Sequence, residues 1–179
     1  MRSDVVVTAF SSGVHRFSSS GANEGLFFNP ADFAPAVFAP TDGIFGDFPE
    51  APNLDFYAAD YFPGNRILRF DKFSGNQVDT ISGGGLQQPN NLAFYDDDLS
   101  VTSAGSDQVL RYDGDTGNFI EVFISNFPIG SPIPLDLPRG LVFRNNSLYV
   151  ANEETDSVLK FSAVTGAYID TFVAGDDIF

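Results

Sequence analysis

Several residue types are absent or scarce in this 179-residue chain, and each absence excludes a class of protein or site. Cysteine is absent, so disulfide bonds and thiolate metal sites are excluded. Tryptophan is absent, and methionine and histidine occur once each. No apolar run reaches the length that a membrane-spanning helix needs.

Basic residues are also few, with 9 Lys and Arg against 24 Asp and Glu and a net charge of −15. A field of this sign repels phosphate backbones and argues against a nucleic-acid partner. The acidic balance suits a secreted or salt-exposed protein, or one that binds cations, and it also serves solubility alone. We therefore expect no nucleic-acid partner, and an extracellular or cell-surface location is favoured.

The residues that are plentiful indicate short strands joined by tight turns. Phenylalanine occurs 20 times, glycine 17 times and proline 11 times. Aromatic residues favour strands, and Gly and Pro favour the turns between them. The chain is therefore expected to be all-β.

One motif occurs four times: an apolar–apolar–basic–aromatic strand (with His in the second position once), followed by a turn that ends in Gly. Its copies are Val14–Gly21, Ile67–Gly75, Val109–Gly117 and Val158–Gly166, with starting points 53, 42 and 49 positions apart. A period near 40–50 residues built from short strands predicts a β-propeller or a similar array. The turn glycines Gly75, Gly117 and Gly166 are predicted to take positive φ in bulged hairpins, which is a structural role.

The last repeat contains four strand segments, which match one propeller blade of four antiparallel strands. The segments are Pro138–Phe143, Leu148–Asn152, Val158–Phe161 and Tyr168–Val173. The same pattern divides residues 1–179 into a single propeller segment with a partial blade at 4–29 and further blades at 30–82, 83–125 and 126–175.

The strand segments of the last repeat resemble the NHL repeat, as found in bacterial secreted NHL-repeat proteins and, more distantly, gluconolactonase-like propellers. The resemblance covers Val5 to Val173 and is strongest from Pro89 onward. It implies a fold and no single function, because NHL-like propellers include scaffolds, RNA binders, lyases and lactonases. The acidic charge disfavours the RNA-binding type.

Such propellers usually have six blades, so the resemblance implies that about four blades of a larger propeller are present. A self-contained small propeller, or an oligomer that closes between chains, is the alternative. Open blade edges at Val5–Val7 and Phe172–Val173 would leave unpaired strand groups, which predicts self-association.

Ligands of NHL-like families bind on one face, here called the top face, which carries the loops between second and third strands and between consecutive blades. Those loops are rich in Asn, Asp and Glu, the hard oxygen donors that suit Ca²⁺. They comprise Asp60–Asn65, Ser82–Asn91, Ser103–Gln108, Ser125–Gly140 and Asn152–Asp156.

Resemblance to the gluconolactonase-like family would place metal-binding Asn or Asp just after the Pro that opens an inner strand. The matching positions are Thr41 or Asp42, then Asn90, then Arg139. Asp42 and Asn90 are the candidate metal ligands, and Ca²⁺ is the only cofactor considered. Arg139 opposes this reading, because a cation stands where a ligand should point. The alternative is that Asn90 and Asn91 cap a turn.

A second candidate set, Asp60, Ser103 and Asn152, stands at equivalent ends of the second strands. Such residues either satisfy loop amides or form a ring that binds a cation or sugar hydroxyls. With Asn90, Asn91 and Arg139 they make up the predicted ligand-binding residues.

No catalytic residue is predicted. His15 replaces a Leu of the other copies and is interpreted as a variant strand position, and no Gly-x-Ser-x-Gly elbow occurs. The sequence favours a non-catalytic binding or structural module that contacts an unknown protein or carbohydrate through its top-face loops. The alternative is a metal-dependent lactonase- or lyase-like enzyme whose site is completed by missing blades, so enzymatic activity stays open at this point.

Overall fold

The computed structural model describes residues 5–9, 13–18, 20–28, 39–46 and 55–175. Within that part, strands dominate, and the helical elements are two 3₁₀ turns, η2 (Ala104–Ser106) and η3 (Glu153–Thr155). No helix among the described residues has the length and apolar character needed to cross a membrane. The strands are β1 (Val5–Ala9), β2 (Gly13–Phe17), β3 (Asn23–Phe28), β4 (Pro40–Phe45), β5 (Phe56–Asp60), β6 (Arg66–Phe70), β7 (Gln77–Ile81), β8 (Pro89–Tyr95), β9 (Asp98–Ser103), β10 (Gln108–Asp113), β11 (Phe119–Ile124), β12 (Pro138–Arg144), β13 (Ser147–Asn152), β14 (Ser157–Ser162) and β15 (Tyr168–Val173).

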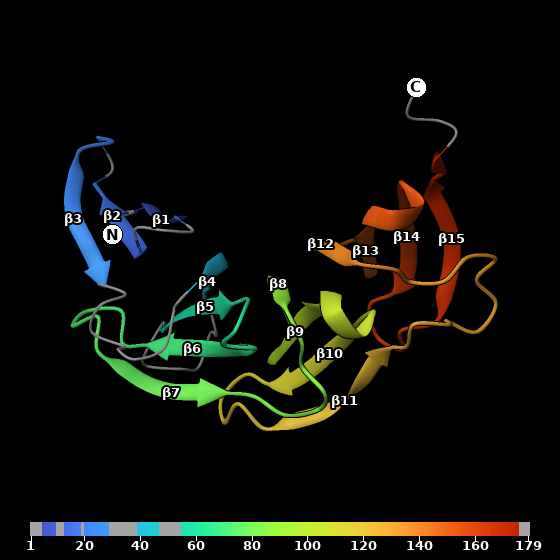
Figure 1. Ribbon diagram of the computed structural model, residues 1–179, viewed down its shortest axis with the longest axis horizontal. Helices are drawn as coiled ribbons and strands as arrows, with labels where there is room; N and C mark the ends of the chain where they lie inside the picture. Colours follow the sequence, from blue (N-terminus) through green and yellow to red (C-terminus); the bar gives the residue numbers. More distant parts are fainter. Residues whose placement is uncertain (1–4, 10–12, 19, 29–38, 47–54, 176–179) are drawn as a thin grey trace.

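The strands form four separate antiparallel sheets, each built from strands consecutive in sequence. Blade 1 is β1–β3, blade 2 is β4–β7, blade 3 is β8–β11 and blade 4 is β12–β15. Figure 1 shows them arranged around an open arc, with β4, β8 and β12 toward its centre and β3, β7, β11 and β15 at its periphery. The arc is not closed, since blade 1 and blade 4 lie apart at its two ends (Figure 1). The prediction of an all-β propeller with four-stranded antiparallel blades is confirmed.

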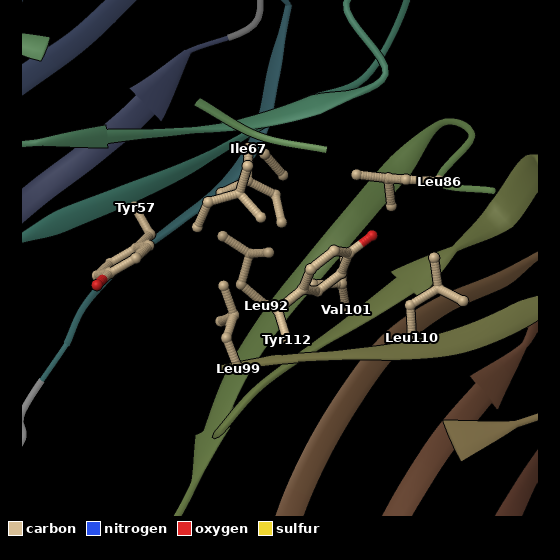
Figure 2. Packing of buried hydrophobic residues seen from close by; sticks show 10 residues of the cluster. Tyr57, Ile67, Leu86, Leu92, Leu99, Val101, Leu110 and Tyr112 are labelled. Atoms are coloured by element: carbon tan, nitrogen blue, oxygen red, sulfur yellow. The ribbon is translucent and has the colours of Figure 1, made fainter. Parts of the chain in front are cut away.

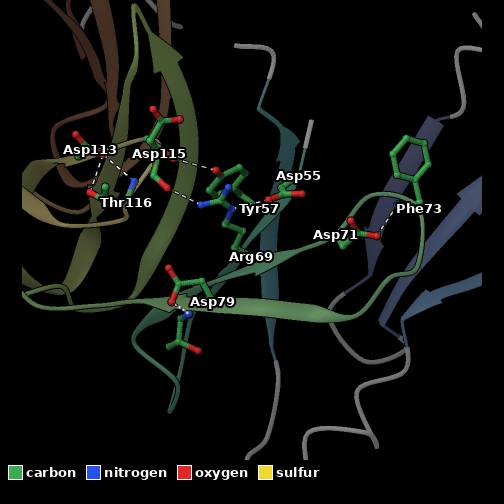
Figure 3. Close-up of polar contacts among 11 residues, drawn as sticks. Asp55, Tyr57, Arg69, Asp71, Phe73, Asp79, Asp113, Asp115 and Thr116 are labelled. Atoms are coloured by element: carbon green, nitrogen blue, oxygen red, sulfur yellow. Dashed lines mark hydrogen bonds and ion pairs between the residues drawn. The ribbon is translucent and has the colours of Figure 1, made fainter. Parts of the chain in front are cut away.

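Each hairpin between the third and fourth strands begins with a side chain that binds the turn. In blade 2, Oδ1 of Asp71 accepts hydrogen bonds from the amides of Phe73 (3.1 Å) and Ser74 (2.7 Å), as Figure 3 shows in part. In blade 3, Oδ1 of Asp113 accepts from the hydroxyl and the amide of Thr116, both at 2.7 Å (Figure 3). These bonds favour the carboxylate forms, and they lower the pKa of Asp71 and of Asp113.

The glycine that ends each hairpin has positive φ, as predicted, with values of 71° at Gly75, 70° at Gly117 and 67° at Gly166. At Gly166 a second constraint is present. A Cβ there would lie 2.3 Å from the backbone oxygen of Phe123, so the hairpin of blade 4 approaches blade 3 too closely for a side chain. Gly166 is therefore required both by its conformation and by blade packing.

Successive side chains of a strand point to opposite faces, so each blade has two packing faces. We call the face toward the next blade the forward face and the other the rear face. Both are apolar where two blades meet, and Figure 2 shows the core between blades 2 and 3. The forward face of blade 2 contributes Ile44, Tyr57, Ala59, Ile67 and Ile81, and the rear face of blade 3 contributes Leu92, Phe94, Leu99, Val101, Leu110 and Tyr112.

The same arrangement recurs along the arc. Between blades 3 and 4 the core contains Ala93, Val109, Phe123 and Ile124 from the forward face and Leu141, Phe143, Leu148, Val150, Leu159 and Phe161 from the rear face. Val14 of blade 1 packs with Phe56, Ala58, Leu68 and Phe70 of blade 2. Each core thus belongs to a pair of neighbouring blades, as expected of a repeat array.

The basic residue of the repeated motif reaches the hairpin of the following blade. Nη1 of Arg69 donates to the carbonyl of Asp115 at 2.6 Å, and the Tyr57 hydroxyl donates to the carbonyl of Gly114 at 3.0 Å. Figure 3 shows Tyr57 and Arg69 facing Asp115. Burial raises the pKa of Tyr57 to about 12. The basic residue of the motif in blade 2 therefore links this blade to the hairpin of blade 3.

Candidate functional site

The predicted ring of Asp60, Ser103 and Asn152 lies at equivalent ends of β5, β9 and β13, and all three residues are at most 1% exposed. Each side-chain oxygen accepts a hydrogen bond from a backbone amide of the loop that enters the same blade. The pairs are Asp60 Oδ1 with Ala39 N at 3.0 Å, Ser103 Oγ with Gln87 N at 2.9 Å, and Asn152 Oδ1 with Asp136 N at 2.6 Å.

Their remaining polar atoms are also used within the chain. Oδ2 of Asp60 accepts from Nε of Arg66 at 2.8 Å, and Nδ2 of Asn152 donates to the carbonyl of Pro134 at 2.9 Å. These bonds hold the entering loops, which is the structural role that buried polar residues usually have. As ligand-binding residues the three remain a prediction.

Asp42 and Asn91 connect the inner strands of three blades. Nδ2 of Asn91 donates to Oδ2 of Asp42 at 2.6 Å, and the amide of Leu92 donates to the same oxygen at 2.8 Å. In turn, Oδ1 of Asn91 accepts from the amide of Leu141 at 2.8 Å. The inner wall is therefore tied from β4 through β8 to β12.

The inner wall is hollowed, with a cavity of about 530 Å³. Asp42 and Asn91 line it together with apolar side chains that include Phe45 and Phe94, and Asp96 adds a carboxylate. The alternative in which Asn90 and Asn91 cap a turn is wrong: both residues lie inside β8, where the pairing with β9 shifts register between Pro89 and Leu92. Such a β-bulge redirects side chains, and here it accompanies the bonds of Asn91 to both neighbouring blades.

The candidate metal ligands behave differently from each other. Oδ2 of Asp42 is occupied by the two bonds just described, whereas the Asn90 side chain makes no hydrogen bond to the described residues. Across the same residues, no three His, Asp or Glu side chains gather to hold a metal ion. A Ca²⁺ site would need further oxygen donors, and Asp42 with Asn90 remains a prediction.

Arg139 lies at the top face, where three blades meet. Its guanidinium carbon is 5.9 Å from the centre of the Tyr61 ring, and its Nε is ion-paired with Glu153. The Tyr61 hydroxyl donates to Oε1 of Gln88 at 3.1 Å. The hydrogen bond that Arg139 donates to Glu153 raises the pKa of Arg139. We call Tyr61, Gln88, Arg139 and Glu153 the top-face group.

The side chains of this group remain open to solvent. That of Arg139 is 33% exposed and that of Glu153 is 49% exposed. The top-face loops also expose large apolar residues, with Phe62 at 59%, Phe127 at 72% and Ile129 at 97%. Tyr61, Gln88 and these three apolar residues lie within the loops that the sequence assigned to the top face, but none of them was predicted individually. Phe62, Phe127 and Ile129 each stand beside a proline in a loop segment. Their exposure to solvent could have been predicted from this position.

No protein-family model matches the sequence, and no curated protein matches it. The fold, however, is similar to several solved structures. The WD40 repeats of RRP9 superpose with a TM-score of 0.70 at 14% identity, covering 93% of this chain and 47% of that one. A catalytically inactive virginiamycin B lyase from Staphylococcus aureus with quinupristin gives 0.69 at 17% identity, covering 96% and 53%.

A nidogen/laminin complex is also similar, with a TM-score of 0.67 at 15% identity, and the match covers 97% of this chain and 60% of that one. The chain thus spans about half the length of the proteins that it resembles. These proteins differ in what they do and agree in architecture, so the similarity concerns the fold. The chain is an open arc of β-propeller blades.

Proposed function

We propose that this chain is a non-catalytic, NHL-like binding module that contacts a protein partner through its top-face loops. The observation that carries the proposal is the exposure of Phe62, Phe127 and Ile129 on the face that also presents Arg139 and Tyr61. Large exposed apolar side chains mark interaction sites when they gather on one face. Arginine and aromatic residues are enriched among the residues that dominate binding energy.

The top-face group supports this proposal through its geometry. Glu153 and the Tyr61 ring hold the Arg139 guanidinium while leaving a third of its side chain exposed. A side chain that is already positioned loses less conformational entropy on binding. The exported or cell-surface location expected from the −15 charge is part of the same proposal.

One of the similar structures is described as a nidogen/laminin complex, which is in keeping with a protein partner. Fold similarity alone does not transfer a partner, and the proposal therefore depends on the exposed side chains of this chain.

A random-peptide phage library selected on the immobilised chain tests this proposal. We expect the selected peptides to bind at least tenfold more weakly to the Arg139→Ala and Phe127→Ala variants. The control is Lys72→Ala, which removes a basic residue from a hairpin on the opposite face. Peptides that lose binding to the control and not to the top-face variants would contradict the proposal.

The second candidate function is a lyase-like enzyme, favoured by the similarity to virginiamycin B lyase with quinupristin. Its site would lie on the inner wall near Asp42 and Asn91, with Asp42 and Asn90 as the candidate metal ligands and Ca²⁺ as the candidate metal. Mass spectrometry of quinupristin incubated with the chain, with and without Ca²⁺, tests this directly. Conversion that Asn90→Ala abolishes would support the enzyme, and unchanged quinupristin would count against it.

A further inference from the structure

The forward face of blade 4 has the residue types of a covered face but is exposed. Phe172 corresponds to Phe123 of blade 3, because both lie at the register shift between the third and fourth strands. Phe123 is 8% exposed beneath blade 4, whereas Phe172 is 60% exposed. Val142, at the position of Ala93, is 57% exposed. This face is therefore built for packing and has no blade against it in the described part of the chain.

The same face carries the pair of side chains that joins blades elsewhere. Tyr149 and Lys160 are paired across β13 and β14, with Nζ 5.7 Å from the ring centre. Tyr57 and Arg69 are paired identically in blade 2, at 5.6 Å, and there they bind two hairpin carbonyls of blade 3. Tyr57 is 1% exposed, but Tyr149 is only half-buried. Blade 4 thus presents donors for the hairpin of another blade.

A groove of about 460 Å³ lies on this face. It is lined by Val142, Arg144, Asn145, Tyr149, Val158 and Phe172.

At the other end of the arc, no blade of the described part of the chain packs against the rear face of blade 1. His15 and Phe17 lie there and are half-buried. Their counterparts in the other three blades are all 0% exposed. These counterparts are Leu68, Leu110 and Leu159 for His15, and Phe70, Tyr112 and Phe161 for Phe17.

We propose that the forward face of blade 4 binds the rear face of blade 1 in a second copy of this chain. The argument is continuity with the interfaces that exist within the chain, where a forward face of this composition is covered by a rear face of the next blade. The contact is heterologous, so it generates a ring or a longer array of copies. The contact packs the side chains of one blade face against those of another. It therefore differs from pairing at strand edges, which would join two sheets through backbone hydrogen bonds.

One difference makes this contact weaker than the internal ones. On the inner wall, Asp42 and Asn91 accept hydrogen bonds from the amides of Leu92 and Leu141 in the following blade. The corresponding residue of blade 4 is Gly140, which has no side chain to bind the next blade. The intermolecular contact therefore lacks the inner-wall hydrogen bond and depends on apolar packing with Tyr149 and Lys160.

The test is the mass of purified residues 1–179 by light scattering, at 150 mM salt so that repulsion between acidic copies is screened. We expect a mass of at least twice 19.3 kDa. Phe172→Asp and Phe17→Asp should each give monomers, with at least a tenfold weaker association. A mixture of the two should associate again, because each variant keeps one intact face. Ile120→Asp, at an exposed position on blade 3, should associate as the original chain does.

Circular dichroism of each variant verifies folding. If either variant does not fold, Val142→Asp replaces it on the forward face and Leu26→Asp on the rear face, since these side chains are 57% and 46% exposed. A monomeric original chain at 100 μM would overturn the proposal. So would association that Phe172→Asp abolishes and Phe17→Asp does not, because two forward faces would then pack on each other.

Discussion

The side-chain amide of Asn91 donates to Oδ2 of Asp42 across the boundary between blades 2 and 3, at 2.6 Å. Asn91 also accepts from the amide of Leu141 in blade 4 at 2.8 Å, so one side chain bridges both interfaces of blade 3. Neither partner is adjacent in sequence. The inner wall of the arc is thus held by polar bonds as well as by the apolar cores beside it.

Replacing Asn91 with Ala should lower the free energy of unfolding by about 2–4 kcal/mol, because it removes a hydrogen-bond partner from both the Leu141 amide and the Asp42 carboxylate. Asn90→Ala is the matched control and should change stability by about 0.5 kcal/mol or less, as expected for a residue without such bonds. Urea unfolding followed by circular dichroism measures both. Equal losses in the two variants would contradict the role assigned to Asn91.

Two buried serines of β9 should respond oppositely to the same substitution. Ser103 Oγ accepts from the amide of Gln87, whereas Ser100 Oγ has no hydrogen-bond partner among the described residues, and both serines are 0% exposed. Ser103→Ala should cost about 1–2 kcal/mol, and Ser100→Ala should leave stability unchanged or raise it by up to about 1 kcal/mol. Thermal unfolding of the two variants compares them directly. A larger loss at Ser100 would mean that its hydroxyl has a partner.

Alkaline pH should destabilise the folded protein through Tyr57. Burial raises the pKa of Tyr57 from 10.0 to about 12, so the unfolded chain loses this proton at lower pH than the folded one. The stabilisation is fully present below pH 10 and is lost as pH rises toward 12, by about 2–3 kcal/mol in total. Unfolding free energies measured between pH 8 and 12 should decline less steeply in Tyr57→Phe. An identical pH dependence in both proteins would exclude Tyr57 as the cause.

Two glycines with positive φ separate conformational strain from steric clash. Gly130 has φ of 86°, and a Cβ added there would have nothing within 4 Å, whereas a Cβ at Gly166 would meet the Phe123 carbonyl at 2.3 Å. Gly130→Ala should cost about 1–2 kcal/mol from strain alone. Gly166→Ala should cost more, since blades 3 and 4 must also separate. Chemical unfolding measures both, and similar losses would show that the hairpin of blade 4 adapts.

The fold was predictable because its signals are local. A repeated strand motif predicts a blade, and Gly75, Gly117 and Gly166 mark turns whose backbone conformation depends on a few neighbouring residues. The alternative in which Asn90 and Asn91 cap a turn was wrong, because it considered only neighbouring residues. Bonds to Asp42 and Leu141, about 50 residues away on either side, accompany a bulge within β8.

The candidate site was less predictable because its members come from different blades. Arg139 was identified from its position after a proline, but its neighbours Tyr61 and Gln88 are contributed by loops of blades 2 and 3. Nothing in the spacing of these residues indicates that they meet. Asp60, Ser103 and Asn152 were recognised as equivalent positions, and their internal bonds became visible only with the entering loops in place.

The division of the core into pairs of neighbouring blades has a kinetic consequence. Each interface joins segments that are consecutive in sequence, so no apolar cluster of the described residues requires the two ends of the arc to meet. Chain closure over the whole length is therefore not needed before burial of apolar area begins. Folding can start at any adjacent pair of blades and spread outward one blade at a time, with a stability that grows by nearly constant increments.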